Sequence, residues 1–101
     1  MENAYVCSSN LADKVKQHNQ ICEGLNKIYE AKNIDYNDSF SKSYAEYGLV
    51  MSCIRLEDKL NRFKALVKNG SQKVADEKTE DTLMDLANYA IMTLIELQNG
   101  E

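Results

Sequence analysis

Hydrophobic residues recur along this chain at intervals of three and four positions, which is the spacing of one face of an α-helix. The first periodic stretch follows Ser9 and Asn10, either of which can cap a helix, and it predicts a helix over about residues 10–32. Its apolar stripe consists of Leu11, Val15, Cys22, Leu25 and Tyr29, with His18 on the same stripe and Ile21 and Ile28 beside it. Residues 1–8 precede this helix and are expected to form a flexible tail.

The middle of the chain predicts two more helices. Residues 33–39 are rich in Asn, Asp and Ser, whose side chains compete for backbone hydrogen bonds, so they predict a turn before a short helix near residues 40–47. Gly48 is expected to end that helix. A third helix is predicted over about residues 49–68, with apolar positions at Leu49, Cys53, Leu56, Leu60, Phe63 and Val67.

The last periodic stretch predicts a fourth helix that ends at Asn99-Gly100. Its expected buried face consists of Leu83, Leu86, Ala87, Ala90, Ile91, Leu94 and Leu97. Residues 70–78 are polar and are expected to form a mobile loop. Because the 101 residues include no Pro and only four Gly, we expect a single all-α domain over residues 1–101, a small bundle of about four helices.

The net charge of −4 limits the range of partners. Binding duplex nucleic acid needs a basic surface, so we expect no duplex partner, whereas a local basic cluster is enough for a small anion. The start of the chain has no basic segment that leads into an apolar run, and residues 86–95, the longest charge-free apolar stretch, are about half a membrane span. We therefore expect a cytoplasmic protein that does not bind membranes.

Three cysteines and a single histidine, without a C-x-x-C pair, indicate neither a disulfide framework nor a zinc site. His18 lies on the apolar side of the first predicted helix and is expected to be structural. Cys22 and Cys53 also lie on apolar faces, so we expect both to be inert core residues.

Acidic residues on the last two predicted helices are candidate metal ligands. Asp81, Asp85 and Asn88 share one side of a helix that is otherwise strongly apolar. If the two helices pack side by side, Glu57 or Asp58 is expected to meet Asp81 and Asp85 and to hold Mg²⁺ with them. The alternative is an exposed polar stripe that keeps the helix in solution.

Cations on the third predicted helix are candidate phosphate ligands. Arg55, Lys59 and Arg62 follow one another at intervals of four and three residues, so they can converge on one anion. We expect them to bind a phosphorylated ligand, with Asn88 as a further contact. The alternative is a network of surface ion pairs between these cations and neighbouring acids, which stabilises a protein little.

An aromatic series overlaps the polar turn before the short helix and consists of Tyr36, Phe40, Tyr44 and Tyr47. Such rings can stack on a nucleobase, which makes Tyr36 a candidate ligand residue. Asp38 or Ser39 then contacts the edge of the base or the ribose. Packing in the core or between subunits is the alternative role for the aromatic series.

Several of these segments resemble one known family. They are Tyr36-Asn-Asp-Ser-Phe40, Tyr47-Gly48, Arg55-Leu-Glu-Asp-Lys-Leu-Asn-Arg62 and Asp81-Thr-Leu-Met-Asp-Leu-Ala-Asn-Tyr-Ala90. Over roughly residues 20–97 the chain is similar to the nucleotide modification associated domain of the first type, which is common in phages and prophages. The resemblance implies a MazG-like all-α fold, related to Mg²⁺-dependent enzymes that split a nucleoside triphosphate into monophosphate and pyrophosphate.

The chain departs from the acidic pattern of those enzymes. Asn61 stands where a second spaced acid is usual, and the final acidic pair, Asp81 and Asp85, is four residues apart instead of three. Fewer carboxylates weaken metal binding. Asn37 replaces a more usual glycine, but asparagine tolerates a left-handed backbone, so the turn is expected to persist.

Three functional hypotheses follow from these residues and from the resemblance. The leading one is a nucleotide-binding protein of phage-type nucleotide metabolism or modification, in particular a Mg²⁺-dependent nucleoside triphosphate pyrophosphohydrolase. The second is a non-catalytic phage protein that sequesters a cyclic nucleotide signal of host antiviral defence, in the host cytoplasm. The third is a structural helical interaction protein. We also expect a homo-oligomer, because four helices give a limited core and leave apolar surface uncovered.

Overall fold

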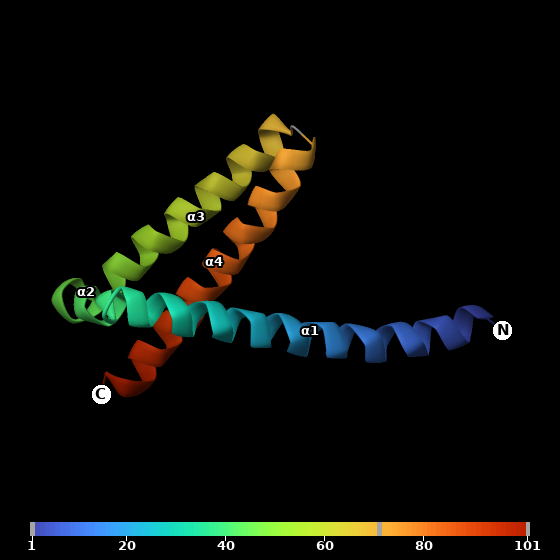
Figure 1. Cartoon of the computed structure of the whole chain (residues 1–101), viewed down its shortest axis with the longest axis horizontal. Coiled ribbons are helices and arrows are strands. Elements are labelled where there is room, and N and C mark those ends of the chain that lie inside the picture. Colours follow the sequence, from blue (N-terminus) through green and yellow to red (C-terminus); the bar gives the residue numbers. More distant parts are fainter. Residues whose placement is uncertain (1, 71, 101) are drawn as a thin grey trace. The chain divides into compact units, whose positions relative to one another are not determined.

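The protein is entirely α-helical where its structure is described. The computed structural model describes the backbone of residues 2–70 and 72–100 and the side chains of residues 10–70 and 78–100. Four helices and no strand occupy these ranges: α1 (Glu2–Asp35), α2 (Ser39–Tyr47), α3 (Leu49–Asn69) and α4 (Gln72–Asn99) (Figure 1). No helix in them is long and apolar enough to cross a membrane. The predicted all-α class with four helices is confirmed.

The two long outer helices begin earlier than the sequence predicted. α1 starts at Glu2 instead of near residue 10, and α4 starts at Gln72 instead of near residue 79. Neither extension contains Pro or Gly, and lengthening an existing helix costs much less than nucleating one. The side chains of residues 1–9 and 71–77 lie outside the described part of the chain, so the flexibility of 1–8 and 70–78 stays a prediction.

Left-handed backbone conformations separate the helices. Asn37 and Asp38 have φ angles of 54° and 57°, which confirms the left-handed turn that the sequence predicted before α2. Gly48 has φ 74° and ψ −159°, a combination that only glycine adopts without strain. Its N–H donates to the carbonyl of Tyr44, and α3 begins at the next residue. Gly70 ends α3 with φ 55°.

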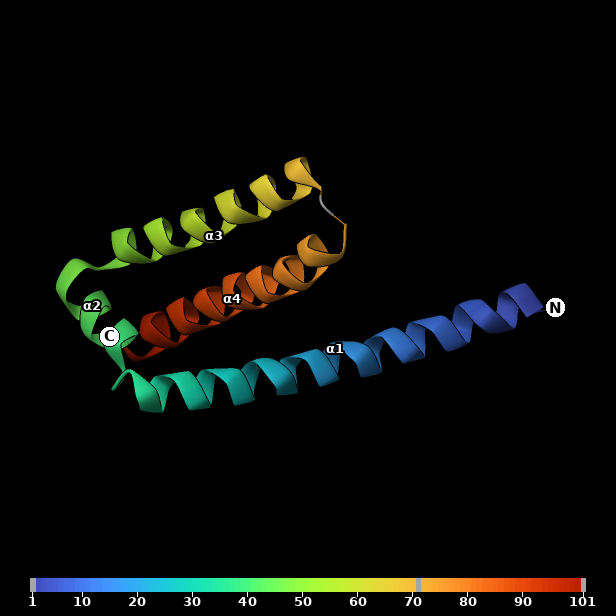
Figure 2. The same ribbon diagram turned by 45° about the horizontal axis from the view of Figure 1, so that its top comes forward.

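The chain divides into two compact units, Met1–Lys32 and Asn33–Glu101. The first unit is a segment of α1. The second unit contains α2, α3 and α4. In it α3 and α4 lie side by side and antiparallel, and α2 packs against both (Figure 2). The single-domain organisation over residues 1–101 stays a prediction.

Aromatic and polar contacts attach α2 to the α3–α4 pair. Phe40 is buried and stacks on Tyr89 of α4, with 5.9 Å between ring centroids and 22° between ring planes. The hydroxyl of Ser41 donates to the carboxylate of Glu96. Because one contact is apolar and the other polar, α2 is fixed both by burial and by hydrogen bonding.

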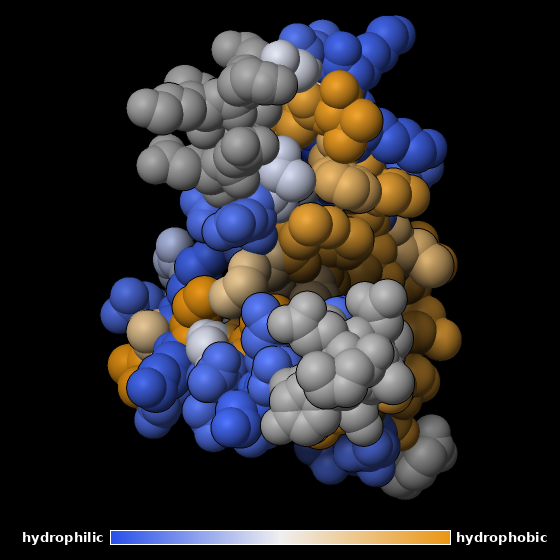
Figure 3. Space-filling model, turned by 90° about the vertical axis from the view of Figure 1, so that its right-hand side faces the viewer, coloured by the Kyte–Doolittle hydropathy of each residue, from blue (hydrophilic) through white to orange (hydrophobic). Residues whose placement is uncertain are grey.

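The predicted buried face of the last helix is only partly buried: Leu86 and Ala87 are half-buried, but its other predicted residues are exposed. The residues of α4 that are buried or half-buried among its neighbours include Thr82, Asp85, Asn88 and Tyr89. By contrast, the predicted core positions Leu83, Ile91, Leu94 and Leu97 are 40–56% exposed. Figure 3 shows hydrophobic side chains gathered on the surface below the turn that joins α3 and α4. A period of 3.6 identifies an apolar face but not the surface that covers it.

The core role predicted for two cysteines is also wrong in this chain. Cys22 and Cys53 are both exposed, because the apolar stripes that carry them are only partly covered. Of the other stripe positions of α3, Leu56 and Phe63 are half-buried, whereas Leu49 is 49% exposed. His18 is exposed as well, and its Nδ1 lies 3.8 Å from the Sγ of Cys22.

The backbone of Gly48 predicts a specific cost of substitution. A Cβ at this position meets nothing within 4 Å, so Gly48→Ala changes backbone strain without creating a clash. We expect the variant to lose about 1–3 kcal/mol of unfolding free energy in chemical denaturation. Gly70→Asn is the matched control, since asparagine tolerates the φ of 55° there, and it is expected to lose less. Equal stability of Gly48→Ala and the wild type contradicts this account.

Candidate functional site

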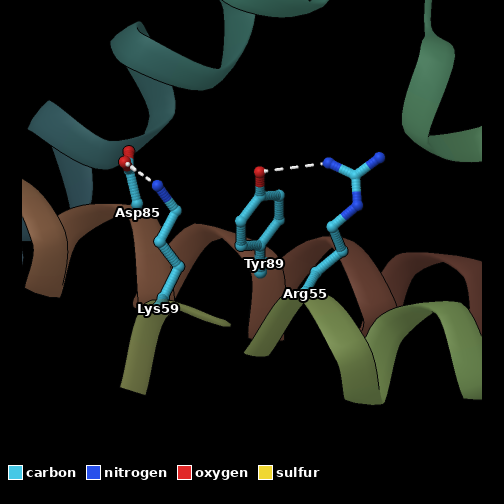
Figure 4. A network of polar contacts seen from close by, with 4 residues as sticks. All are labelled: Arg55, Lys59, Asp85 and Tyr89. Carbon is cyan, nitrogen blue, oxygen red and sulfur yellow. Dashed lines mark hydrogen bonds and ion pairs between the residues drawn. The ribbon is translucent and has the colours of Figure 1, made fainter. Parts of the chain in front are cut away.

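Two cations of α3 contact two side chains of α4 across the helix pair. Arg55 and Lys59 lie one turn apart on α3, and Asp85 and Tyr89 lie one turn apart on α4. Because the helices run antiparallel, Lys59 faces Asp85 and Arg55 faces Tyr89, as Figure 4 shows. The result is two parallel cross-helix contacts, of which one is an ion pair and the other involves a neutral aromatic ring.

The ion pair is close and partly shielded from water. Nζ of Lys59 lies 3.0 Å from Oδ2 of Asp85, and the two side chains are 26% and 30% exposed. Shielding strengthens the attraction relative to a fully exposed pair, but it also increases the desolvation cost of each charge. The carboxylate of Asp85 is therefore engaged by a cation that belongs to the chain itself.

Arg55 has a different environment. Its Nη1 donates to the hydroxyl of Tyr89 at 3.5 Å, a long hydrogen bond, and its guanidinium carbon lies 5.9 Å from the centroid of the ring. Both contacts are with a neutral side chain, and no carboxylate within the described ranges pairs with Arg55. The exposed guanidinium thus keeps its charge available to an external anion.

The aromatic ring that supports Arg55 is itself held in place. Tyr89 is half-buried, Phe40 stacks on it, and its backbone carbonyl accepts a hydrogen bond of 2.8 Å from the hydroxyl of Thr93. A ring fixed in this way offers the guanidinium a preorganised surface, so less conformational freedom is lost when an anion binds.

The four predicted metal ligands do not gather in a single chain. Glu57, Asp58 and Asp81 are exposed, and Asp85 is paired with Lys59. Among the side chains of residues 10–70 and 78–100, no group of three or more His, Cys, Asp or Glu residues is arranged to hold a metal ion. Mg²⁺ is usually bound by one or two carboxylates together with water and phosphate oxygens, and the carboxylate at this surface already has a cationic partner. The donor set therefore does not fit Mg²⁺ in this arrangement.

The predicted ligand-binding residues also do not all lie at one place. Arg55 and Lys59 lie together at the α3–α4 surface, whereas the buried Asn88 points away from solvent. Four others are exposed: Tyr36 and Asp38 in the turn before α2, Ser39 at the start of α2, and Arg62 on α3. No described contact joins these four residues to Arg55. Phe40 is instead the residue of α2 that reaches the site, through Tyr89.

Tyr89 is the site residue that the sequence did not single out. Its position four residues after Asp85 places it on the same side of α4, which was a usable signal. The aromatic series near α2 was the more obvious candidate for stacking on a nucleobase. The contact with Arg55 depends on the register between α3 and α4, which one helix alone does not define.

Comparison with known proteins gives a family. No curated protein and no solved structure matches the chain. A family model described as nucleotide modification associated domain 1 matches residues 32–97, which include α2, α3 and nearly all of α4. Arg55, Lys59, Asp85 and Tyr89 all lie within the matched range. Because this match covers more than half of the chain, the protein belongs to the nucleotide modification associated domain 1 family.

Proposed function

We propose that this protein binds a phosphorylated nucleotide and that Arg55 receives its phosphate. The observation that supports the proposal is the exposed guanidinium of Arg55, which rests against Tyr89 without a described carboxylate partner. Membership of a family associated with nucleotide modification supports a nucleotide-related role. An arginine in this setting can form two charge-assisted hydrogen bonds to one phosphate group.

The surrounding charges favour a small ligand over a polymer. Lys59 is paired with Asp85, so Arg55 and the exposed Arg62, two turns further along α3, supply the positive charge for a ligand on a chain of net charge −4. A short anion can use such a cluster, whereas a nucleic acid duplex meets the surrounding acidic surface. The exposed Tyr36, Asp38 and Ser39 remain the proposed contacts for base and ribose.

Two finer forms of this function differ in whether the ligand is changed. The Lys59–Asp85 ion pair favours a protein that binds without catalysis, for example a phage protein that sequesters a cyclic nucleotide signal of host antiviral defence. The alternative is a MazG-like Mg²⁺-dependent nucleoside triphosphate pyrophosphohydrolase, which requires carboxylates from elsewhere to join Asp85. A structural helical interaction protein, the third hypothesis, requires no nucleotide.

A nucleotide panel separates these forms. The purified protein is incubated with mono-, di- and triphosphates and cyclic nucleotides, with Mg²⁺ and with chelator, and both turnover and thermal shift are recorded. Stabilisation by a ligand that is recovered unchanged is the expected result, because a ligand that binds only the folded state raises apparent stability. Turnover that requires Mg²⁺ supports the enzyme instead. Neither effect with any compound supports the structural role.

Arg55→Ala tests the proposed phosphate contact. We expect the variant to bind the stabilising nucleotide more weakly by about 1.5–3 kcal/mol in calorimetry, since it removes hydrogen bonds to a charged group. Lys64→Ala is the matched control, because Lys64 is also an exposed cation of α3 and has no described partner. Added salt should weaken wild-type binding more than binding by Arg55→Ala. Equal affinities of Arg55→Ala and the wild type place the phosphate elsewhere.

We also propose that the protein forms a homo-oligomer through the apolar side of α4. The exposed residues Leu83, Ile91, Leu94 and Leu97 support this, because they recur on one helical face and residues 86–95 carry no charge. Contiguous apolar surface of this kind is typical of protein interfaces.

Light scattering checks the oligomer directly. The wild type should have a mass that is a multiple of 11.5 kDa at micromolar concentration. Leu94→Glu places a charge on a side chain that is 56% exposed, so we expect it to shift the protein to smaller species without unfolding it. Lys64→Glu is the control for added negative charge. A wild type that is monomeric at every concentration tested rules out the proposal.

A further inference from the structure

We infer that Lys59 is a built-in counter-ion for Asp85, so that this protein binds phosphorylated ligands at Arg55 without a divalent cation. The inference rests on the proposed function for its ligand. It concerns a different residue pair, however, and the metal chemistry of that pair can be measured with no nucleotide present.

The first argument is the position of the ammonium group. Nζ of Lys59 lies 3.0 Å from the carboxylate of Asp85, within the distance of a direct ion pair. A Mg²⁺ ion on the same carboxylate oxygen would lie within a few ångströms of the ammonium, and the two positive charges would repel each other. With both side chains less than one third exposed, water screens that repulsion only in part.

Asp85 also lacks further metal-binding side chains around it, within the part of the chain whose side chains are described. Asp81 lies one turn before Asp85 but is exposed, and no three metal-binding side chains of the described residues converge. One carboxylate that is already paired is a poor start for an octahedral Mg²⁺ site. Lys59 thus supplies the positive charge that a metal ion would otherwise bring to Asp85.

The third argument connects the pair to the phosphate. Asp85 lies one helical turn from Tyr89 and therefore close to the anion proposed at Arg55. An uncompensated carboxylate there repels a phosphate, and the ammonium of Lys59 cancels that repulsion. Lys59 is in this sense a positioning residue, which compensates a charge beside the ligand instead of carrying out chemistry.

Manganese alone, measured by calorimetry, tests the inference without any nucleotide. The wild type should bind Mn²⁺ too weakly to detect, whereas Lys59→Met should bind it at least about tenfold more tightly, because the variant lacks the ammonium that repels a metal ion at Asp85. The gain should disappear in Lys59→Met/Asp85→Asn and should be absent in Lys64→Met, which removes an exposed lysine of the same helix. Wild-type Mn²⁺ binding that Asp85→Asn abolishes overturns the inference, and so does a Lys59→Met variant that binds no more Mn²⁺ than the wild type.

ATP binding supplies the second readout. The ATP affinity of the wild type in chelator should equal its affinity in Mg²⁺ within about twofold. The Lys59→Met variant should bind ATP more weakly in chelator and should recover the wild-type affinity in Mg²⁺. Lys59→Arg keeps the charge and should behave like the wild type, and thermal unfolding checks that each variant is folded. If ATP binding to the wild type requires Mg²⁺ and Asp85, the inference falls while the proposed function stands. If the wild type binds no nucleotide at all, the proposed function falls and the manganese result still decides the role of Lys59.

Discussion

The ring of Tyr89 is the point at which the three helices of the second unit meet. Phe40 brings α2 onto one side of the ring, Arg55 of α3 lies over it, and Thr93 ties its backbone to the next turn of α4. Phe40 is 7% exposed, so its burial on this ring contributes to the attachment of α2. The residue that organises the packing also supports the guanidinium at the surface, and stability and the proposed site therefore share one side chain.

The contact of Arg55 with this ring reflects the register between α3 and α4. If the helices slid by one turn, about 6 Å, Arg55 would face Asp85 and Lys59 would face Asp81, which makes two ion pairs instead of one. Ion-pair energy alone favours that arrangement, but partly exposed pairs contribute little. In the observed register Arg55 instead meets the neutral ring of Tyr89, on which Phe40 stacks. This cation therefore has no carboxylate partner among the described residues, which is the feature an anion site requires.

The α3–α4 pair is unusual in the side of α4 that it covers. Thr82 and Asn88 are 3% and 9% exposed, while most of the leucines of that helix face solvent. The hydroxyl of Ser52 on α3 is buried without a hydrogen-bond partner in the described part of the chain, which reduces the gain from packing there. The two helices also contain buried or half-buried apolar side chains, such as Met51 and Leu86, but Leu83, Ile91, Leu94 and Leu97 of α4 stay 40–56% exposed and leave apolar surface for a partner to cover. This is the physical basis for expecting association with further copies.

The sequence by itself determined the helical class, the bounds of α2 and α3, and the left-handed turn at Asn37, because propensity, periodicity and turn chemistry are local properties. Arg55, Lys59 and Asp85 were also site candidates from the sequence, since their spacing places them on defined helix faces, and their role in binding stays a prediction. Only the tertiary structure decided which of these residues meet. Pairing between helices depends on register and on rotation about each helix axis, which the period of one helix leaves open. The tertiary structure therefore brought Tyr89 into the site, paired Asp85 with Lys59 and turned the leucines of α4 outward.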